Sequence, residues 1–203
     1  MKPDQETKLY QIAETQLGYF TSKQASLAGY SAVNHPYHVN KGHWVREHRG
    51  IYRLANFPQS PEGEFVLWSL WSRNQSDIPQ GVYSHETALS LYEVSDVLPA
   101  KLHMTVPKQF RKAGNRPTVL VLHRADLTID EIQKKTGFSV TTPFKTVTDL
   151  LAEGVLSEDI IKQALKEFFQ QGLLTEKDTI KLVEKHPSLA KHIFRLAQIE
   201  NRL

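Results

Sequence analysis

The sequence predicts an α+β protein, with an N-terminal winged helix-turn-helix followed by a mixed α/β domain that has a small sheet and a C-terminal helical bundle. Three observations support this prediction. Residues 18–54 contain two short helical segments with a glycine between them, and then a stretch of alternating polar and apolar residues. Residues 102–122 contain an alternating apolar segment and a continuous apolar run, both typical of strands. From residue 144 or so onwards the pattern is helical.

The N-terminal helices are expected from apolar spacing and capping residues. A first amphipathic helix is expected from Asp4 to Leu17. Thr21 and Ser22 can both cap a second helix, because their side-chain oxygens accept from the free N–H groups of its first turn. Gly29 can end that helix, since glycine adopts φ > 0 readily.

The next helix, roughly Ala32 to Lys41, is the candidate recognition helix. Pro36 falls inside it, where proline removes a hydrogen bond and disfavours helix at the residue before it. The helix therefore either begins late, with Pro36 in its first turn, or is kinked. After Gly42, the stretch HWVREHRGIYRL alternates around Arg49-Gly50, which predicts a hairpin, the wing.

In such a unit the second helix of the pair enters the DNA major groove. Asn34 and His35 would meet base edges, and asparagine can make a bidentate contact with adenine. The other candidates are backbone-contacting residues of the preceding helix and donors of the recognition helix and wing. They are Ser22, Lys23, Gln24, Tyr37, His38, Lys41, Arg46, His48 and Arg49. Short helix–hairpin units also serve as protein-interaction modules, and this alternative stays open.

Composition bounds the class of protein. The chain has 203 residues, of which 40% are hydrophobic and 23% charged, enough for one or two domains with a buried core. No apolar run approaches about 20 residues, and the N-terminus is polar, so neither a membrane span nor a signal peptide is expected. The chain has no cysteine, which excludes disulfides, thiolate zinc sites and cysteine nucleophiles, and is compatible with a cytoplasmic protein.

The positive charge is concentrated at the N-terminus. Residues 1–57 carry seven Lys and Arg against four Asp and Glu, whereas residues 58–203 carry eighteen of each. Four of the nine histidines also lie within residues 35–48. The formal net charge of +3 therefore lies on the expected winged unit. A small excess of positive charge there is what weak electrostatic attraction to DNA phosphates would require.

The stretch FPQSPEGE predicts a domain boundary, with residues 1–57 before it and residues 58–203 after it. A helix is expected from Ser60 to about Arg73, its Trp68 and Trp71 serving as core or as an interface, and Ser84 is expected to cap another. Strands are expected at 102–106, 119–122 and 138–140, and a short helix at 130–135. Further helices are expected after residues 143, 157, 174 and 185.

A second basic patch lies between the first two of these strands. It has four positive charges and no acid, and its members are Lys108, Arg111, Lys112 and Arg116. Two interpretations remain open. The segment could be a loop that contacts DNA phosphates or an acidic partner, or it could be a solvated hairpin loop.

The segments GYFTSKQASLAGYS, RGIYRL, YSHETALSLYEVSD, LHMTVPK and TTPFKTVTDLL, in that order, resemble the AbiEi family of antitoxins of type IV toxin-antitoxin systems. The resemblance covers residues 5–155 approximately. It implies a winged helix-turn-helix that represses its own operon by binding inverted repeats in double-stranded DNA, and a C-terminal domain used in antitoxicity. It also implies a nucleotidyltransferase-like toxin that is counteracted without a stable complex. By position, DNA contact is implied for Thr21–Gln24, Ser31–Lys41 and Arg46–Arg49.

The rival classes are weaker, and no enzyme activity, cofactor or metal is predicted. A nuclease would need an acid-x-Lys motif on an apolar strand, which accompanies neither Asp126 nor Asp149, and Asp149 is expected to bond the TTP turn. A zinc site among the histidines of residues 35–48 lacks a suitable acidic or thiolate ligand. Ser84-His85-Glu86 has the letters of a triad, but adjacent residues are expected to point apart. A pure interaction protein, using the Trp68/Trp71 helix and the C-terminal helices, stays open.

Overall fold

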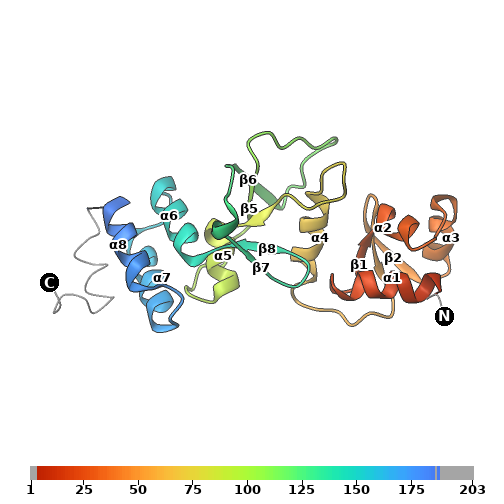
Figure 1. Ribbon diagram of the computed structural model, residues 1–203, viewed down its shortest axis with the longest axis horizontal. Helices are drawn as coiled ribbons and strands as arrows, with labels where there is room; N and C mark the ends of the chain where they lie inside the picture. Colours follow the sequence, from red (N-terminus) through yellow and green to blue (C-terminus); the bar gives the residue numbers. More distant parts are fainter. Residues whose placement is uncertain (1–3, 186, 188–203) are drawn as a thin grey trace. The chain divides into compact units, whose positions relative to one another are not determined.

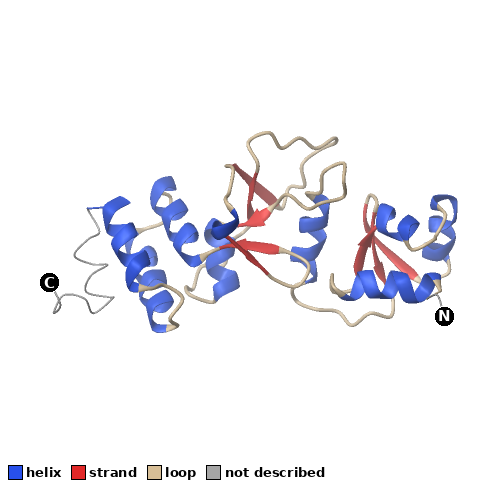
Figure 2. Ribbon diagram, in the orientation of Figure 1, coloured by secondary structure: helices blue, strands red, loops and turns tan. Residues whose placement is uncertain are grey.

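A computed structural model of the chain describes residues 4–185 and 187 and shows an α+β protein with two small sheets and several helices (Figures 1 and 2). The described part divides into two compact units. The first comprises the chain up to Gly81 together with Phe110–Lys112 and Lys134–Ser139, and the second comprises the remaining segments. None of the described helices combines the length and the apolar character needed to span a membrane.

The first unit begins with helices and a three-stranded antiparallel sheet of order β1-β3-β2. Its elements are α1 (Gln5–Glu14), β1 (Tyr19–Thr21), α2 (Ser22–Leu27), η1 (Ala32–Asn34), α3 (His35–Asn40), β2 (Trp44–His48), β3 (Ile51–Leu54) and α4 (Gly63–Trp71). The hairpin β2–β3 turns at Arg49-Gly50, where Gly50 has φ +70°. The expected hairpin is therefore present, and β1 extends it into a sheet.

Caps at their N-termini define the first two helices. Asp4 accepts from the Thr7 N–H at 2.7 Å and caps α1. Thr21 caps α2 in a reciprocal capping box, in which its hydroxyl accepts from the Gln24 N–H and the Gln24 side chain accepts from the Thr21 N–H. The predicted cap at Thr21 is thus confirmed.

Aromatic rings fill the core between these helices and the sheet. Phe20 is fully buried, with its ring centroid 4.9 Å from that of Trp44 in an edge-on arrangement and 5.8 Å from that of Tyr52 in a stacked one. Leu9 and Ala13 of α1 pack into the same cluster. The core thus fixes α1, the sheet and the helices that follow as one body.

The first compact unit continues beyond the expected boundary. Helix α4 packs on β1, where a Cβ atom added at Gly63 would lie 2.9 Å from the Tyr19 hydroxyl. Arg73 pairs with Asp77 at 2.8 Å and donates to the Gly50 carbonyl of the wing turn at 3.3 Å. The compact units do not separate after residue 57, and a domain boundary at that residue stays a prediction.

The second unit contains a five-stranded sheet of order β6-β5-β4-β8-β7, except that Lys134 at the end of β7 and Ser139 at the start of β8 are counted in the first unit. Its elements are β4 (Val82–Tyr83), α5 (His85–Tyr92), β5 (Leu102–Val106), β6 (Leu120–Arg124), η2 (Ile129–Glu131), β7 (Ile132–Lys134), β8 (Ser139–Thr141), α6 (Pro143–Glu153), α7 (Glu158–Gln170) and α8 (Glu176–Lys185). Strand β5 pairs parallel with β6 and antiparallel with β4, which pairs parallel with β8. The helices α6, α7 and α8 follow the sheet in sequence (Figure 1).

The structure differs from expectation at residues 130–135, and the expected C-terminal helix is not among the described residues. The expected helix at 130–135 is wrong, because the chain forms the short turn η2 and then strand β7. Thr128 and Glu131 form a capping box around the single turn, and the chain becomes extended at Ile132. The expected final helix, from His186 to Leu203, lies outside the described residues except for Pro187.

Candidate functional site

The candidate surface lies on η1, α3 and the wing. Asn34, Tyr37 and Lys41 are exposed, and the Lys41 ammonium lies 5.9 Å from the centre of the Tyr37 ring. Arg46 and Arg49 are exposed on the hairpin. These side chains present an amide, a phenol, an ammonium and two guanidinium groups to solvent, which is the set of donors that phosphates and base edges accept from.

Pro36 decides where the helix begins. The chain makes one 3₁₀ turn at Ala32–Asn34, and α3 starts at His35 with Pro36 in its first turn. Proline is tolerated there because its missing N–H has no intrahelical partner at that position. Of the two alternatives, the late start is therefore the one observed.

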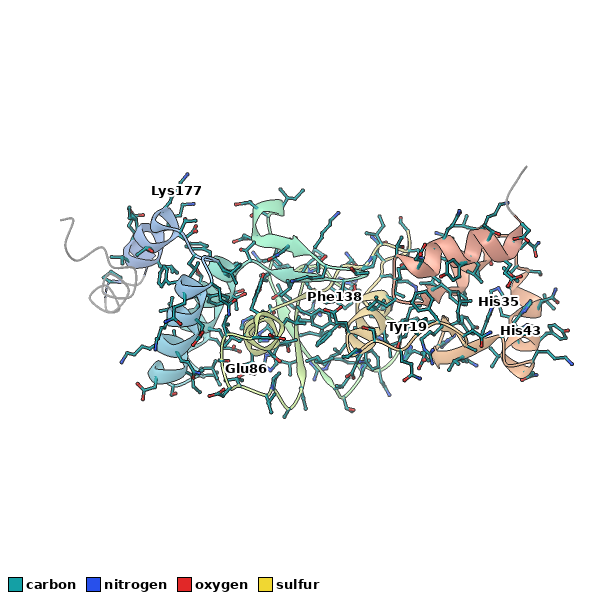
Figure 3. All side chains as sticks on the ribbon, turned by 90° about the horizontal axis from the view of Figure 1, so that it is seen from below. Tyr19, His35, His43, Glu86, Phe138 and Lys177 are labelled. Atoms are coloured by element: carbon teal, nitrogen blue, oxygen red, sulfur yellow. The ribbon has the colours of Figure 1, made fainter. Side chains whose placement is uncertain are left out.

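Two of the predicted contact residues are inside the protein. The Thr21 side chain is fully buried, and besides capping α2 its hydroxyl donates to the Asp77 carboxylate. His35, labelled in Figure 3, is only 3% exposed and packs against the Trp44 and Tyr52 rings at centroid distances of 5.3 and 5.8 Å. The prediction that Thr21 and His35 contact DNA is therefore wrong, because both side chains are buried.

Two other histidines are half-buried. His38 stacks on Trp44 with ring centroids 4.7 Å apart, and burial, followed by the neighbouring His43 and His35, lowers its pKa. His48 lies edge-on to Trp68 at 5.6 Å. Among the described residues the buried His48 Nδ1 has no hydrogen-bond partner. Both rings therefore pack against tryptophan side chains and are only partly accessible to a ligand in solvent.

The residues that begin α2 are already engaged within the first unit. Gln24 bonds reciprocally with the Gln16 side chain at 3.0 and 3.1 Å, and Lys23 donates to the Gln75 carbonyl at 3.3 Å. Ser22 is half-buried, and Ser31 is exposed beside η1. Of this group, Lys23 and Ser31 are the most accessible.

Comparison with known sequences adds a family to this geometry. Residues 8–55 match the sequence model of a family described as "Transcriptional regulator, AbiEi antitoxin". Residues 8–55 belong to the AbiEi family. The match supports a regulatory, antitoxin-type role for the chain, and the family is one of regulators rather than of enzymes. The resemblance inferred from the sequence is confirmed over this region.

One solved structure extends the comparison beyond the AbiEi region. The RV2827C protein of Mycobacterium tuberculosis is similar over 98% of this chain and 78% of its own, with a TM-score of 0.57 and 10% sequence identity. At that identity the likeness shows a shared fold. No curated protein matches the chain in sequence.

The residues of the second basic patch divide between the two compact units. Lys112 is half-buried, donates to the Arg73 carbonyl at 2.8 Å and lies 5.9 Å from the centre of the Trp71 ring, all within the first unit. Lys108 lies 4.0 Å from Asp126 in the second unit, and both are well exposed. Arg111 and Arg116 are exposed. Lys112 is thus engaged in contacts within the first unit. The exposed donors on η1, α3 and the β2–β3 hairpin therefore remain the candidate surface.

Two details of the second unit differ from expectation. Asp149 accepts from the Lys145 ammonium at 2.5 Å rather than bonding the TTP turn, whose Thr142 caps α6. The Ser84 hydroxyl lies 2.9 Å from His85 Nδ1, so these adjacent side chains do meet, and His85 has φ +53°. Ser84 is nonetheless fully buried and is not placed to attack a substrate from solvent. His85 also joins His123 and Glu153 in a group that could hold a metal ion.

Replacing Thr21 with alanine is expected to destabilise the first unit through loss of the cap rather than to remove a contact with DNA. Loss of the cap should lower the free energy of unfolding by about 1–2 kcal/mol. Urea denaturation of the full chain measures the stability, and fluorescence anisotropy with a DNA duplex measures the affinity. A loss of affinity at unchanged stability would return Thr21 to the contact surface.

Proposed function

We propose that the protein is a DNA-binding transcriptional repressor and the antitoxin of a type IV toxin-antitoxin system. The observation that carries the proposal is the exposed donor set of Asn34, Tyr37 and Lys41, with Arg46 and Arg49 on the hairpin, in a region that belongs to a family of regulators. In the proposal, η1 and α3 form the recognition segment of a winged helix-turn-helix. The hairpin β2–β3 is its wing.

The proposed roles follow from the chemistry of each side chain. Asn34 precedes α3, the position from which recognition helices reach base edges, and its carboxamide can pair with adenine. Lys41, Arg46 and Arg49 carry positive charge and would contact phosphates, which fixes the register of the protein on the duplex. Arg53 is excluded from this set, because it pairs with Glu47 at 2.8 Å.

The proposal assigns residues 1–57 to the DNA-binding domain and residues 58–203 to an antitoxin-type domain. A repressor of its own operon acts in the cytoplasm on inverted repeats upstream of its gene. The proposed toxin is a nucleotidyltransferase-like enzyme that the antitoxin counteracts without a stable complex. Co-expression with the neighbouring gene tests this part: growth arrest by that gene alone and rescue by the present chain would support it, whereas arrest despite the chain would contradict it.

The DNA-binding part is tested by a gel-shift titration of the full chain on the DNA upstream of its own gene. The titration is made at two salt concentrations with unrelated DNA as competitor. Salt-sensitive binding that survives the competitor supports a specific autorepressor. Binding that is lost equally to any DNA, or no binding, favours the alternative of a protein-interaction module.

Replacing Asn34 with alanine is expected to relax sequence preference rather than to abolish binding. A bidentate amide–adenine contact contributes about 1–3 kcal/mol of discrimination. Competition between the upstream duplex and duplexes with single base changes measures this preference for parent and variant. Leu27→Ala, an exposed position on α2 outside the proposed recognition segment, serves as the control. An unchanged preference in the Asn34 variant would remove this side chain from base reading.

A further inference from the structure

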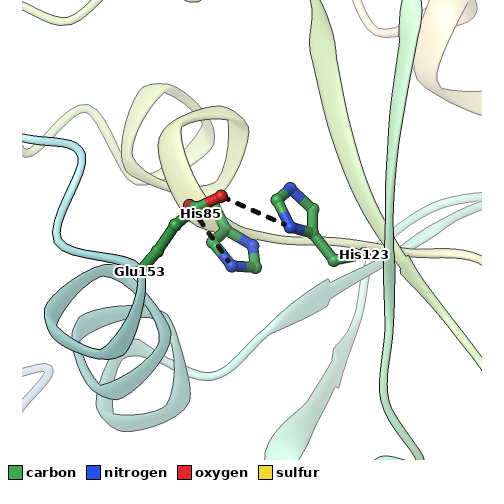
Figure 4. A group of neighbouring side chains, drawn as sticks. All are labelled: His85, His123 and Glu153. Carbon is green, nitrogen blue, oxygen red and sulfur yellow. Dashed lines mark ion pairs between the residues drawn. The ribbon is translucent and has the colours of Figure 1, made fainter.

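Three side chains from distant parts of the sequence converge in the second unit. His85 is the first residue of α5, His123 lies on β6, and Glu153 is the last residue of α6. One ligand atom from each lies within 4.8 Å of the other two. His85 Nε2 and His123 Nδ1 are each 3.7 Å from a carboxylate oxygen of Glu153, and Figure 4 shows both rings turned toward it.

A chain of hydrogen bonds fixes which nitrogen of His123 faces this point. Glu86 Oε2 lies 2.7 Å from His103 Nε2, and because a carboxylate only accepts, that nitrogen carries the hydrogen. His103 Nδ1 and His123 Nε2 lie 3.0 Å apart and share a hydrogen. The Nδ1 atom of His123 is the nitrogen directed at Glu153. Carboxylate–histidine support of this kind is what orients histidines that bind metal ions.

His85 is supported in a similar way. Its Nδ1 lies 2.9 Å from the Ser84 hydroxyl, which in turn accepts from the Thr105 hydroxyl at 2.8 Å. Nε2 is the nitrogen that faces Glu153, and it can bind an ion when Nδ1 carries the ring hydrogen and donates it to the Ser84 hydroxyl. The ring stacks on that of His123 with centroids 3.7 Å apart. Burial and the neighbouring histidines lower the pKa of His85 to about 3, and burial likewise lowers the pKa of His123.

Two imidazole nitrogens and a carboxylate therefore converge at separations too long for a hydrogen bond between them. Zinc bonded tetrahedrally at 2.0–2.1 Å requires ligand atoms about 3.3 Å apart. The 3.7 Å separations join His85 and His123 to different oxygens of Glu153, and the two rings are stacked, so the side chains have to turn toward a shared ion when it binds. We propose that His85, His123 and Glu153 bind a divalent transition-metal ion, Zn²⁺ in the first instance. Two nitrogen ligands favour such an ion over Mg²⁺ or Ca²⁺, which prefer oxygen ligands.

The surroundings leave the site accessible. The Glu153 side chain is 33% exposed, so an ion can enter from solvent and a water molecule can take the fourth position. Lys145, whose charge acts on His85, is held by Asp149 on the same helix. Bound metal would join α5, β6 and α6, and would therefore stabilise the second unit. The proposal does not depend on DNA binding, because its ligands all lie outside the AbiEi region.

The test is a titration of the full chain with zinc after dialysis against a chelator. Calorimetry measures affinity and stoichiometry, and Co²⁺ substitution reports geometry through its visible absorption bands. We expect one tight equivalent in the parent, with intense tetrahedral Co²⁺ bands. Glu153→Gln should weaken zinc binding at least about tenfold, and His103→Gln, which alters positioning only, by about 10–100-fold. His43→Ala removes an exposed histidine near His38 and is the matched control.

The variants distinguish zinc binding at the proposed ligands from nonspecific zinc binding to other histidines. The proposal stands if Glu153→Gln and His123→Ala lose the tight equivalent while His43→Ala keeps it. If His123→Ala fails to fold, Glu153→Gln decides alone, since its carboxylate is partly exposed at the end of a helix. Parent-like affinity in Glu153→Gln, loss of the site in His43→Ala, or no saturable zinc binding by the parent would each overturn the proposal.

Discussion

Replacing Phe20 with alanine is expected to lower the free energy of unfolding of the first unit by about 3–5 kcal/mol. The ring is fully buried and touches both Trp44 and Tyr52, so its removal leaves a cavity at the centre of the helix–sheet core. A loss of this size is a large fraction of the stability of a small domain. We therefore expect the variant to lose DNA binding through unfolding rather than through a missing contact.

Urea denaturation followed by tryptophan fluorescence measures this loss, because Trp44 packs against the deleted ring. Leu27→Ala is the control within the same unit, since Leu27 is 74% exposed and its truncation should change stability by no more than about 0.5 kcal/mol. A loss below about 1 kcal/mol for Phe20→Ala would contradict the core described above.

Replacing Lys41 and Arg49 together with alanine is expected to weaken binding to every DNA sequence and to flatten its dependence on salt. Each phosphate contact releases counterions and contributes about 0.9 to the slope of log K against log salt. The double variant should therefore lose a slope of about 2. Both side chains are exposed, so folding should be unaffected, which circular dichroism checks.

The matched control is Lys177→Ala, an exposed lysine on α8 in the second unit (Figure 3). It changes net charge without touching the proposed surface and should leave the slope within error of the parent. Equal slopes for the parent and the double variant would show that Lys41 and Arg49 do not contact phosphates.

Much of the first unit could be predicted from local sequence signals. The cap at Thr21, the hairpin around Gly50 and the start of α3 near Pro36 are each determined by a few neighbouring residues. Strand β1 could not be predicted in this way. It has three residues, all buried, and it exists because Ile51, Tyr52 and Arg53 of β3 pair with it across the sheet.

The site residues show the same limit. Asn34, Lys41 and Arg49 are exposed as their polar character suggests, whereas the polar residues Thr21 and His35 are buried by the tertiary packing. The histidine cluster of the second unit carries no local signal. His103 and His123 approach each other because β5 and β6 pair in parallel with Thr105 opposite His123, a register that residue spacing does not reveal.

Directed cleavage of DNA from the recognition segment tests the central claim most directly. The chain has no cysteine, so Val33→Cys gives a single attachment point for an iron–EDTA group next to Asn34, on a side chain that is 85% exposed. Ile129→Cys, at a side chain 89% exposed in the second unit, is the control. We predict that the Val33 conjugate cuts both strands within the upstream inverted repeats at positions that the Ile129 conjugate leaves intact. A Val33 conjugate that shifts the DNA but cuts it no more than the control would contradict reading of DNA by η1 and α3.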